Sequence, residues 1–568
     1  MKVPGSVRPR VLARDLVKES IPKFNPIIAN GVATEQFKYL ESYIRKIFRD
    51  TASLFPDELK FLGMRRVDPI AEARHVLEKC EKGSNRTIEI AESSVYLVVF
   101  DFQFTPNIPG AKPEVISHHV YLPYLVDGSR IWIRGVLNTV IPVLTAPVFS
   151  ITNQGGTPLI FLKLLAAKLT FKRMNAYTFL LNRQPSTHGV VFSQIWRGDR
   201  KRMTHYQEKK NDSIQIKHIV ALYLFMEYGL TGAFKKYCGV DVKVFVGEVP
   251  EEYKDESKWW VCKTAGRKPV SFKRGVYIPH EIYLVIPAPE KKSLDETNML
   301  YALLVGFFYI ADSYALQMPS KHNGRGIDDL DDESFWAEIL GHAIFWTNEH
   351  ISTYQSQVRR HMNHVRNMLD YQQAQDIRNA GIEGIGDMFD LLAYIMANFA
   401  SIITTNDNGS LYNKRLLILR NVLEGLINGI NTIQNKSLSG AELKDRAVKR
   451  DIRENLPEEK VLRMQKQQYV MTIPSPSDCK AFSYTSKFLM QNNISDNNKL
   501  DKINPTDPDN RLHASVLEIG SYLAIKRSEL SGRQLLNPYQ LVNSSGITLR
   551  NDELKPQTEY ISKMISRD

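Results

Sequence analysis

The chain of 568 residues is 43% hydrophobic, 24% charged and 10% aromatic, a composition typical of a large globular protein that excludes a disordered, collagen-like or coiled-coil chain. Its 74 Lys and Arg against 62 Asp and Glu leave a net charge of +12, which favours an anionic partner such as nucleic acid. At roughly 100–200 residues per domain, this length predicts about three to five domains or lobes.

The sequence predicts a protein that stays inside a cell. The first twenty residues carry Pro4, Pro9 and many charges but no apolar segment of the kind found in secretory signals. The longest apolar run, Met299–Ala311, is too short to span a bilayer and predicts a buried helix. The cysteines are widely spaced without a C-x-x-C pair, which predicts free thiols and a reducing compartment; they are Cys80, Cys238, Cys262 and Cys479.

The hydrophobic pattern of the first third changes from helix to strand. Apolar residues spaced three and four apart predict helix from about 34 to 80. Short runs rich in Val, Ile, Tyr and Phe then predict a β-rich part over 87–149. A mixed stretch to about 195 leads into the basic, poorly hydrophobic segment 197–210, which we interpret as an exposed arm or linker.

The rest of the chain predicts a further α+β block and a helical block. Helical spacing over 214–238 is followed by alternating strand patterns over 240–287. Nearly everything from 295 to 437 has helical period, whereas 438–568 is polar with a few short apolar pieces. This order predicts an α+β fold with several lobes.

Familiar catalytic signatures are missing from the sequence. No G-x-x-x-x-G-K-[ST] loop, post-strand G-x-G-x-x-G or G-x-S-x-G motif occurs. Two groups could in principle bind metal. The alternative for the first is surface or interhelix packing, and the alternative for the second is a solvated helix start. The two groups are a histidine-rich group (His342, Glu349, His350, His361, His364) and an acidic run (Asp328, Asp329, Asp331, Asp332, Glu333).

Two basic groups could neutralise phosphates, with an ordinary solvated surface as the alternative. One is the segment 197–210. The second contains interleaved aromatic residues, which favour a nucleic-acid surface; it consists of Lys263, Arg267, Lys268, Lys273 and Arg274 with Trp259, Trp260, Phe272 and Tyr277.

Four blocks, in order, resemble the β subunit of multisubunit RNA polymerases. The first, HHVYLPYLVDGSRIWIRGVLNTVIPVLTAPVFS, is similar to the family's "P-L-M" turn, "G-x-x-x-I-x-G" and following apolar strand, and the second, HIVALYLFMEYGLTGAFKKYCGV, resembles its "V-x-L-x-x-A-L-G" helix. The matching positions are Leu122, Pro123, Leu125, Gly128, Ile133, Gly135, Val140, Ile141, Leu144, Pro147 and Phe149, then Leu222, Leu224, Phe225, Tyr228 and Gly229.

The third and fourth blocks carry the basic residues of the resemblance. NDNGSLYNKRLLILRNVLEGLI is similar to "D-D-x-D-x-x-x-N-K-R-x-x-x-x-G-x-L-L", with Asn421 near the usual glycine, and ELSGRQLLNPYQLV resembles "P-R-Q-L-H-P-x-x-W-G" without its His and Trp. The matching positions are Asp407, Tyr412, Asn413, Lys414, Arg415, Leu416 and Leu423, then Arg533, Gln534, Leu535 and Pro538.

The third block also has a physical interpretation of its own. We expect residues 413–415 to open a helix, so that the basic pair is fixed at the end of a rigid rod. An ordinary amphipathic helix with a charged start is the alternative. Its expected core stripe is Leu416, Leu419, Leu423, Leu426, Ile427 and Ile430.

The resemblance covers only the N-terminal half of β. The family's C-P-x-E-T-P-E-G element and C-terminal clamp are missing, as is the N-A-D-F-D-G-D loop that holds the catalytic magnesium on β′. A β subunit divided between polypeptides is a feature of RNA polymerases of giant tailed bacteriophages. The resemblance therefore implies an N-terminal helical segment at 1–80, a protrusion-like part at 81–210, an inserted lobe-like part at 211–290, a helical block at 291–437 and a fork-like region at 438–568.

The resemblance implies a role in the DNA and RNA–DNA hybrid cleft of a phage-encoded, DNA-directed RNA polymerase. Expected partners are other split β-like and β′-like subunits, DNA template and RNA product, with Mg²⁺ held by a partner chain and no membrane. The expected location is the cytoplasm of the infected host, or also the virion. No catalytic or metal-binding residue is expected in this chain; the expected nucleic-acid contacts are Lys414, Arg415, Lys526, Arg527, Arg533, Gln534, Arg267, Lys268, Lys273 and Arg274.

Two other functions are compatible with the composition. A large, basic, mixed-fold chain without a catalytic motif could be a virion structural or scaffold protein, which would self-assemble through a repeated interface. The histidine-rich helical block could instead belong to a histidine/carboxylate metalloenzyme.

Overall fold

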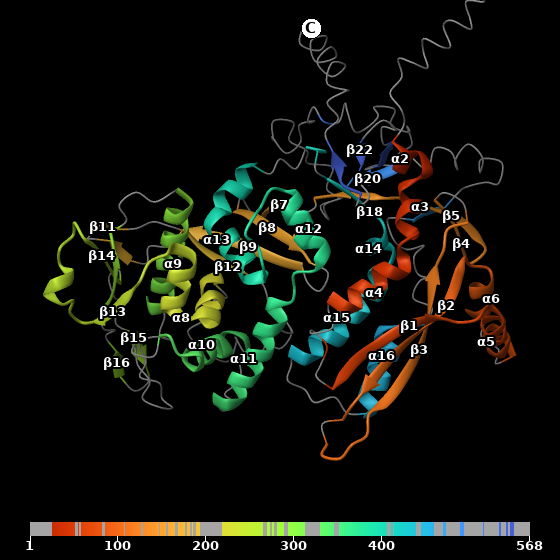
Figure 1. Ribbon diagram of the computed structural model, residues 1–568, viewed down its shortest axis with the longest axis horizontal. Helices are drawn as coiled ribbons and strands as arrows, with labels where there is room; N and C mark the ends of the chain where they lie inside the picture. The colour runs from red at the N-terminus through yellow and green to blue at the C-terminus, as the bar shows by residue number, and fades with distance from the viewer. Residues whose placement is uncertain are drawn as a thin grey trace, which may run out of the picture.

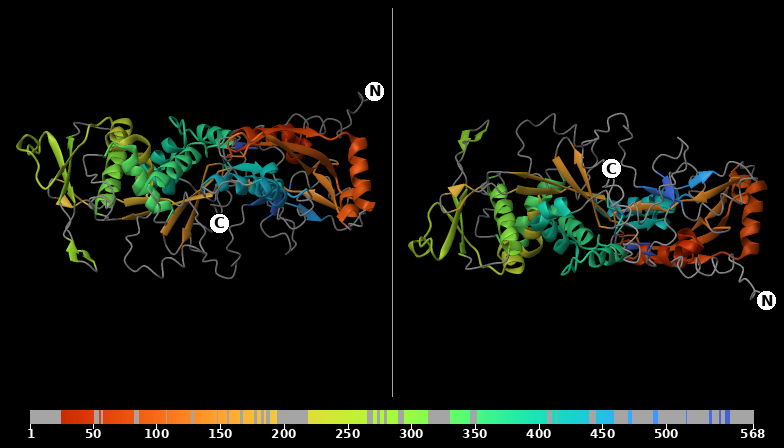
Figure 2. Two further views of the ribbon diagram at one scale, coloured as in Figure 1. Left: turned by 90° about the horizontal axis from the view of Figure 1, so that it is seen from below. Right: turned by 90° about the horizontal axis from the view of Figure 1, so that it is seen from above.

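The computed structural model describes residues 25–50, 55, 58–81, 86–106, 108–126, 129–146, 148–154, 157–164, 168–175, 179–181, 184–185, 189–193, 219–264, 270–272, 275–277, 281–288, 294–312, 330–345, 351–405, 410–412, 414–438, 445–458, 470–472, 489–492, 515, 533–535, 541–542 and 546–549. These residues form two units that follow one another along the longest axis (Figure 1 and Figure 2). We call residues 25–146 together with 410–549 the main unit, and residues 148–405 the inserted unit.

The main unit is organised around an antiparallel sheet of order β1-β2-β3. Strand β2, VYLVVFDFQF, is rich in the β-branched and aromatic residues that favour strands. Its Phe100, Phe102 and Phe104 pack with helices α4, α15 and α16, whereas Leu97 faces Ile90 of α6. The elements before the inserted unit are α2 (Pro26–Asn30), α3 (Val32–Phe37), α4 (Leu40–Asp50), β1 (Leu59–Arg66), α5 (Pro69–Glu81), α6 (Arg86–Ala91), β2 (Val95–Phe104), β3 (Glu114–Pro123), β4 (Arg130–Ile133), β5 (Val136–Val140) and β6 (Val143–Thr145).

The main unit is completed by segments from the end of the chain. Strand β19 pairs with β5, and β20 pairs with β6. These later elements are β18 (Arg415–Leu417), α14 (Leu419–Val422), α15 (Glu424–Leu438), α16 (Asp445–Asn455), β19 (Val470–Thr472), β20 (Leu489–Asn492), β21 (Arg533–Leu535), β22 (Leu541–Val542) and β23 (Thr548–Leu549).

The inserted unit has one large core, in which helices α8, α9, α10 and α13 pack with strands of two sheets. The sheets have the orders β12-β9-β8-β7 and β11-β10-β14-β17-β13. The elements are β7 (Phe149–Gln154), β8 (Thr157–Lys163), β9 (Lys168–Asn175), β10 (Phe179–Leu181), β11 (Gln184–Pro185), β12 (Gly189–Ser193), α8 (Val220–Cys238), β13 (Lys243–Val246), the 3-10 helix η2 (Glu251–Tyr253), β14 (Trp259–Thr264), β15 (Val270–Phe272), β16 (Gly275–Tyr277), β17 (Ile282–Pro287), α9 (Leu294–Asp312), α10 (Glu333–Phe345), α11 (Ile351–Arg366), α12 (Tyr371–Asn379) and α13 (Met388–Thr405).

The predicted α+β class is confirmed, as are strands within 87–149 and 240–287 and the buried helix at Met299–Ala311. Two local predictions were wrong. Residues Leu59–Arg66 form strand β1 rather than helix, because they pair with β2. Residues Arg415–Leu417 form β18 rather than a helix start, because they pair with β6, and the helical stripe begins only at Leu419. Within the described ranges, no helix is long and apolar enough to cross a membrane.

Candidate nucleic-acid interface

A four-stranded sheet of order β18-β6-β20-β21 joins the two ends of the main unit, and we call it the junction sheet. Strand β6 comes from the first block of the resemblance, β18 from the third and β21 from the fourth. Arg415 pairs with Thr145, and Arg533 pairs with Gln491 of β20. The fold therefore brings the expected residues Arg415, Arg533 and Gln534 to the two edge strands of one sheet, with Lys414 directly before β18.

The backbone around Lys414 is held firmly by distant segments. The Leu416 amide donates to the carbonyl of Gly546 at 2.7 Å, and the Thr548 amide donates to the carbonyl of Lys414 at 2.7 Å. The Gln36 side chain of α3 donates to the Leu416 carbonyl at 2.7 Å and accepts from the Ile418 amide at 3.1 Å. These bonds fix the backbone that carries Lys414, whose side chain is half-buried.

Arg415 has a different environment from its neighbour. Only 4% of it is exposed, and its guanidinium forms an ion pair with Asp376 of α12 in the inserted unit. Burial lowers the pKa of Arg415, and it raises the pKa of Asp376 to about 6 despite the nearby Arg415 charge. In this structure the guanidinium lies inside the protein, so its contact with nucleic acid stays a prediction.

The other expected contacts are described only in part. For Arg533 and Gln534 the structure describes the backbone alone. Residues Lys526, Arg527, Arg267, Lys268, Lys273 and Arg274 lie outside the described residues, as does the basic segment 197–210.

The tryptophans next to the second basic group are half-buried and take part in internal packing. Trp259 contacts Tyr253 edge-on with ring centroids 5.0 Å apart, and Trp260 packs at 5.8 Å from Tyr301. These contacts account for both tryptophans without a nucleic acid.

Asp331 and Asp332 of the acidic run each cap a helix, whereas Glu333 pairs with Arg359 at 2.7 Å. Asp331 accepts from the Thr231 amide at 2.8 Å and from its hydroxyl at 2.7 Å, at a break in α8. The break is at Gly229, whose φ of 72° suits glycine and where a Cβ would lie 2.9 Å from the Asp331 Oδ1 atom. Asp332 accepts from the Ser334 amide at 2.9 Å at the start of α10. Asp328 and Asp329 are outside the described residues.

The histidines of α11 face the core. His361 is 1% exposed and its Nε2 lies 3.2 Å from the Tyr223 hydroxyl, and His364 is 3% exposed. Burial lowers the pKa of His364 to about 4. Glu349, His350 and the His342 side chain are not described, and no group of three or more His, Cys, Asp or Glu in the described part of the chain is arranged to hold a metal.

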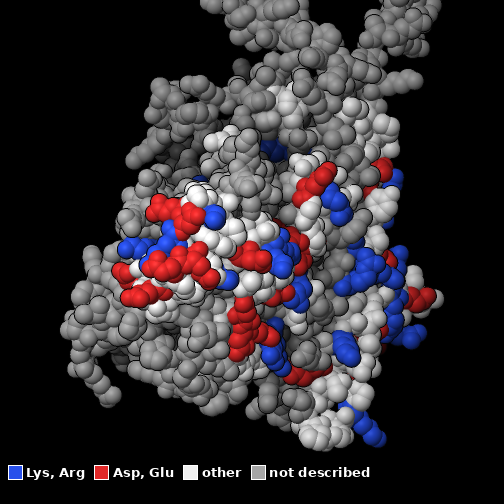
Figure 3. All heavy atoms as spheres, turned by 60° about the vertical axis from the view of Figure 1, so that its left-hand side comes forward, with Lys and Arg blue, Asp and Glu red and all other residues white. Residues whose placement is uncertain are grey.

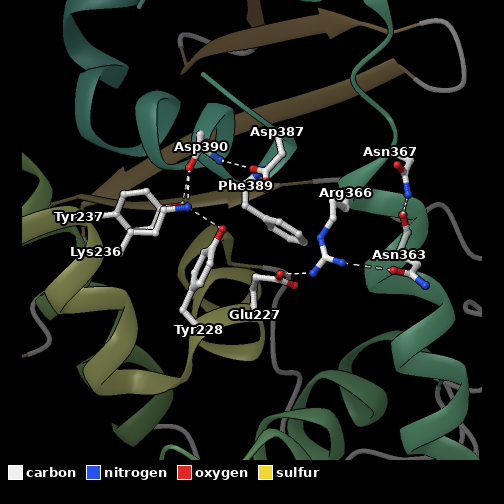
Figure 4. Close-up of polar contacts among 10 residues, drawn as sticks. All are labelled: Glu227, Tyr228, Lys236, Tyr237, Asn363, Arg366, Asn367, Asp387, Phe389 and Asp390. Atoms are coloured by element: carbon white, nitrogen blue, oxygen red, sulfur yellow. Dashed lines mark hydrogen bonds and ion pairs between the residues drawn. The ribbon is translucent and has the colours of Figure 1, made fainter. Parts of the chain in front are cut away.

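A polar network that the sequence analysis did not identify joins α8 to the start of α13 (Figure 4). Lys236 donates to Asp390 at 2.8 Å and to the Tyr228 hydroxyl at 2.8 Å, and Tyr237 donates to Asp390 at 3.2 Å. Burial by itself would lower the pKa of Lys236, but the hydrogen bonds to Asp390 and Tyr228 raise it. The ammonium is therefore firmly charged and already paired.

The same network reaches helix α11 through a second ion pair (Figure 4). Arg366 pairs with Glu227, donates to Asn363 at 3.4 Å and lies 5.8 Å above the Phe389 ring. Burial raises the pKa of Glu227, and Arg366 opposes this shift. Because each charge has a partner within the protein, the arrangement fastens three helices together rather than presenting a free catalytic group.

The surface of the inserted unit carries both signs of charge (Figure 3). In this view Lys and Arg side chains lie among the Asp and Glu side chains. The described residues on this face do not form a uniformly basic surface of the kind expected for DNA binding.

Comparison with known families decides the broader identity. A family model described as "Non-virion RNA polymerase subunit" matches residues 10–507. The chain belongs to this family. A search of curated proteins finds no match to the chain. This membership identifies the protein as an RNA polymerase subunit. The matched residues include the whole inserted unit, most of the main unit and three of the four strands of the junction sheet, β6, β18 and β20.

Proposed function

We propose that this chain is the N-terminal β-like subunit of a phage-encoded, multisubunit DNA-directed RNA polymerase and borders the cleft for DNA and the RNA–DNA hybrid. The main support is the junction sheet, which unites three of the four segments that resemble β and begins its strand β18 directly after Lys414. The family match over residues 10–507 supports the polymerase role independently.

In this proposal the chain positions nucleic acid and does not perform chemistry itself. The magnesium-binding D-F-D-G-D motif is missing from the sequence, so a β′-like partner chain would hold the metal and transfer the nucleotide. Lys414, on its rigid backbone, would contact a phosphate. The non-virion description favours an enzyme acting in the cytoplasm of the infected host over a virion structural protein or packaged polymerase.

The test begins with the tagged chain, purified gently from infected cells. Co-purifying polypeptides are identified by mass spectrometry, and DNA-templated ribonucleotide incorporation is assayed. We expect β′-like chains and activity that needs DNA. A self-assembled, inactive chain without polymerase partners would contradict the proposal.

The contact of Lys414 is tested within the same complex. Lys414→Gln should weaken DNA binding and reduce the slope of log affinity against log salt by about 1, because one phosphate contact is lost. The control is Lys449→Gln, which removes an exposed lysine of α16 that pairs with Glu114 at 2.6 Å. Equal slopes for both variants would exclude a phosphate contact by Lys414.

A further inference from the structure

The last strand of the five-stranded sheet in the inserted unit has an edge that no other described strand covers. The sheet has the order β11-β10-β14-β17-β13, so β13 pairs with β17 on one side only. It lies at the end of the inserted unit that is remote from the main unit (Figure 1). An open strand edge offers unpaired main-chain donors and acceptors to a further strand.

The hydrogen bonding to β17 determines which residues of β13 face the open edge. The amide of Gly247, directly after β13, donates to the Glu281 carbonyl at 2.7 Å. In an antiparallel ladder, residues that bond to the partner strand alternate with residues whose main-chain groups point away from it. Phe245 therefore bonds to β17, whereas the N–H and C=O groups of Val244 and Val246 point to the open edge.

The side chains of the two edge-facing residues are apolar and partly exposed. Val246 is 46% exposed, and Val244 is half-buried where it packs against the core of the inserted unit. Because these residues are two apart, their side chains lie on the same face of the sheet. A strand added at this edge would extend that face with apolar side chains of its own.

The segment that contains β13 and its connection to β14 is acidic, although the whole chain is basic. Between residues 241 and 258, three lysines stand against six exposed acidic residues: Asp241, Glu248, Glu251, Glu252, Asp255 and Glu256. Each lysine has a partner in this segment, in the pairs Lys254–Glu251, Lys258–Asp255 and Lys243–Tyr253. Within the described part of the chain, Glu248, Glu252 and Glu256 form no ion pair. These carboxylates favour a basic ligand and repel nucleic acid.

The connection from β13 to β14 holds part of this acidic segment against the strand. The buried Tyr253 of η2 packs with ring centroids 5.4 Å from Phe245 of β13 and 5.0 Å from Trp259 of β14. The hydrogen bond from Lys243 to Tyr253 raises the pKa of Lys243, and the charge of Glu252 raises it further. Glu252 therefore lies near β13.

Lysines on edge strands often prevent pairing with other chains, but Lys243 is not placed to do so. Its ammonium group bonds to the Tyr253 hydroxyl and lies 4.9 Å from the centre of the Tyr253 ring. The charge is thus held over one face of the sheet and leaves the edge of β13 open.

We propose that β13 is a docking edge for an extended, basic segment of another polypeptide, which adds to the sheet as a further strand. Main-chain hydrogen bonds to Val244 and Val246 supply affinity, and alternate apolar side chains of the segment pack beside the two valines. Its Lys or Arg side chains face the carboxylates of Glu248 and Glu252. The site belongs to the inserted unit alone, so it stands whether or not the proposed function holds.

The test measures binding of a synthetic peptide to the full chain by fluorescence anisotropy. The labelled probe is Lys-Val-Lys-Val-Lys-Val-Lys, whose valines would pair with the edge-facing residues of β13. The control peptide has the same sequence with N-methylated valines, so it keeps the charge and loses the donors. We expect the parent chain to bind the probe, and to bind the control peptide about tenfold more weakly or less, because two hydrogen bonds are lost.

Substitutions in the chain test the same contact from the other side. Val246→Pro removes an N–H group that points to the open edge and no bond to β17, so it should weaken binding about fivefold. Its matched control, Val246→Thr, keeps the N–H group and should bind like the parent. Glu248→Gln combined with Glu252→Gln should weaken binding and reduce its salt dependence, whereas Glu78→Gln, at an exposed position of α5, should change neither.

The docking edge is overturned if the parent chain does not bind the probe. Equal binding of the N-methylated peptide would also overturn it, since attraction between charges would then be sufficient. Should Val246→Pro fail to fold, the N-methylated peptide with the parent chain decides the question. An equal loss of binding in Glu78→Gln and in the double variant would contradict the assigned place of binding.

Discussion

The main unit and the inserted unit of this chain reach stability in different ways. The inserted unit is continuous in sequence and has one large core, to which α8, α9, α10 and α13 contribute mainly apolar faces. The main unit has three smaller clusters, and its central sheet is covered by α15 and α16 from beyond residue 420. A continuous unit can fold by itself, whereas a discontinuous unit depends on the return of the chain.

The largest expected effect comes from cutting the chain between the units. A fragment ending at residue 409 lacks β18, α15 and α16, so we expect its main unit to unfold while residues 148–405 remain folded. Hydrogen exchange resolved by peptide measures both units in one sample. Protection of β1–β3 equal to that in the full chain would contradict the difference between the units.

Core truncations should act on one unit at a time. Phe100→Ala in the main unit and Trp336→Ala in the inserted unit each remove a fully buried aromatic ring and should cost about 3–5 kcal/mol of local stability. Because the cores share no described residue, hydrogen exchange should increase only in the unit that carries the substitution. An equal increase of hydrogen exchange in both units would instead show that they unfold as a single cooperative structure.

Breaking the buried ion pair should lower the stability of the protein somewhat less than removing a well-packed aromatic ring. Arg415→Met leaves the Asp376 carboxylate buried without its partner, which should lower the free energy of unfolding by about 3 kcal/mol. Adding Asp376→Leu removes the unpaired charge and should restore most of this loss. Denaturant titration of the single and double variants tests this, and a double variant no more stable than Arg415→Met would show that the charge pair is not the cause.

The carboxyl group of Asp376 should also make the stability of the folded chain depend on pH, although this effect is smaller. Burial raises the pKa of Asp376 from its ordinary value near 3.8 to about 6, so between these values the folded chain keeps a proton that the unfolded chain releases. Its contribution to stability is therefore largest below 3.8 and is lost as the pH rises through about 6. Subtracting the profile of Asp376→Asn from that of the parent isolates this contribution, and a difference that does not vary with pH would disprove the raised pKa.

The smallest effect concerns the helix break inside the inserted unit. Asp331→Ala removes the cap of the second half of α8 and should cost about 1 kcal/mol. Asp241→Ala, which removes only an exposed ion pair to Lys235, is the control and should cost almost nothing. Thermal melting of both variants tests the difference, and equal melting temperatures would show that Asp331 does not act as a cap.

Local pattern was sufficient for elements that are strongly periodic or strongly apolar. The buried helix at Met299–Ala311 and the aromatic strand at 95–104 were predictable, because their own side chains require burial in any fold. The stripe Leu419, Leu423, Leu426, Ile427 and Ile430 is likewise buried as predicted. The strand at 59–66 was missed because its mixed pattern becomes a strand only through pairing with β2.

The polar contacts between segments that lie far apart in the chain left no signal in the sequence. Gln36 and Leu416 are 380 positions apart, and Arg415 and Asp376 are 39 apart on different elements. Side-chain hydrogen bonds at such separations have no periodicity, so no local pattern can predict them.

The sequence by itself determined the α+β class, the main buried segments and, through its resemblance, the place of this chain among RNA polymerase subunits, because these depend on composition, periodicity and motif order. Only the tertiary structure decided that Arg415 is buried against Asp376, that Asp331 caps a broken helix, and that segments near residues 145, 415 and 533 share one sheet. Burial and pairing between distant segments are properties of the folded chain, since each residue acquires its neighbours only when the units close around it.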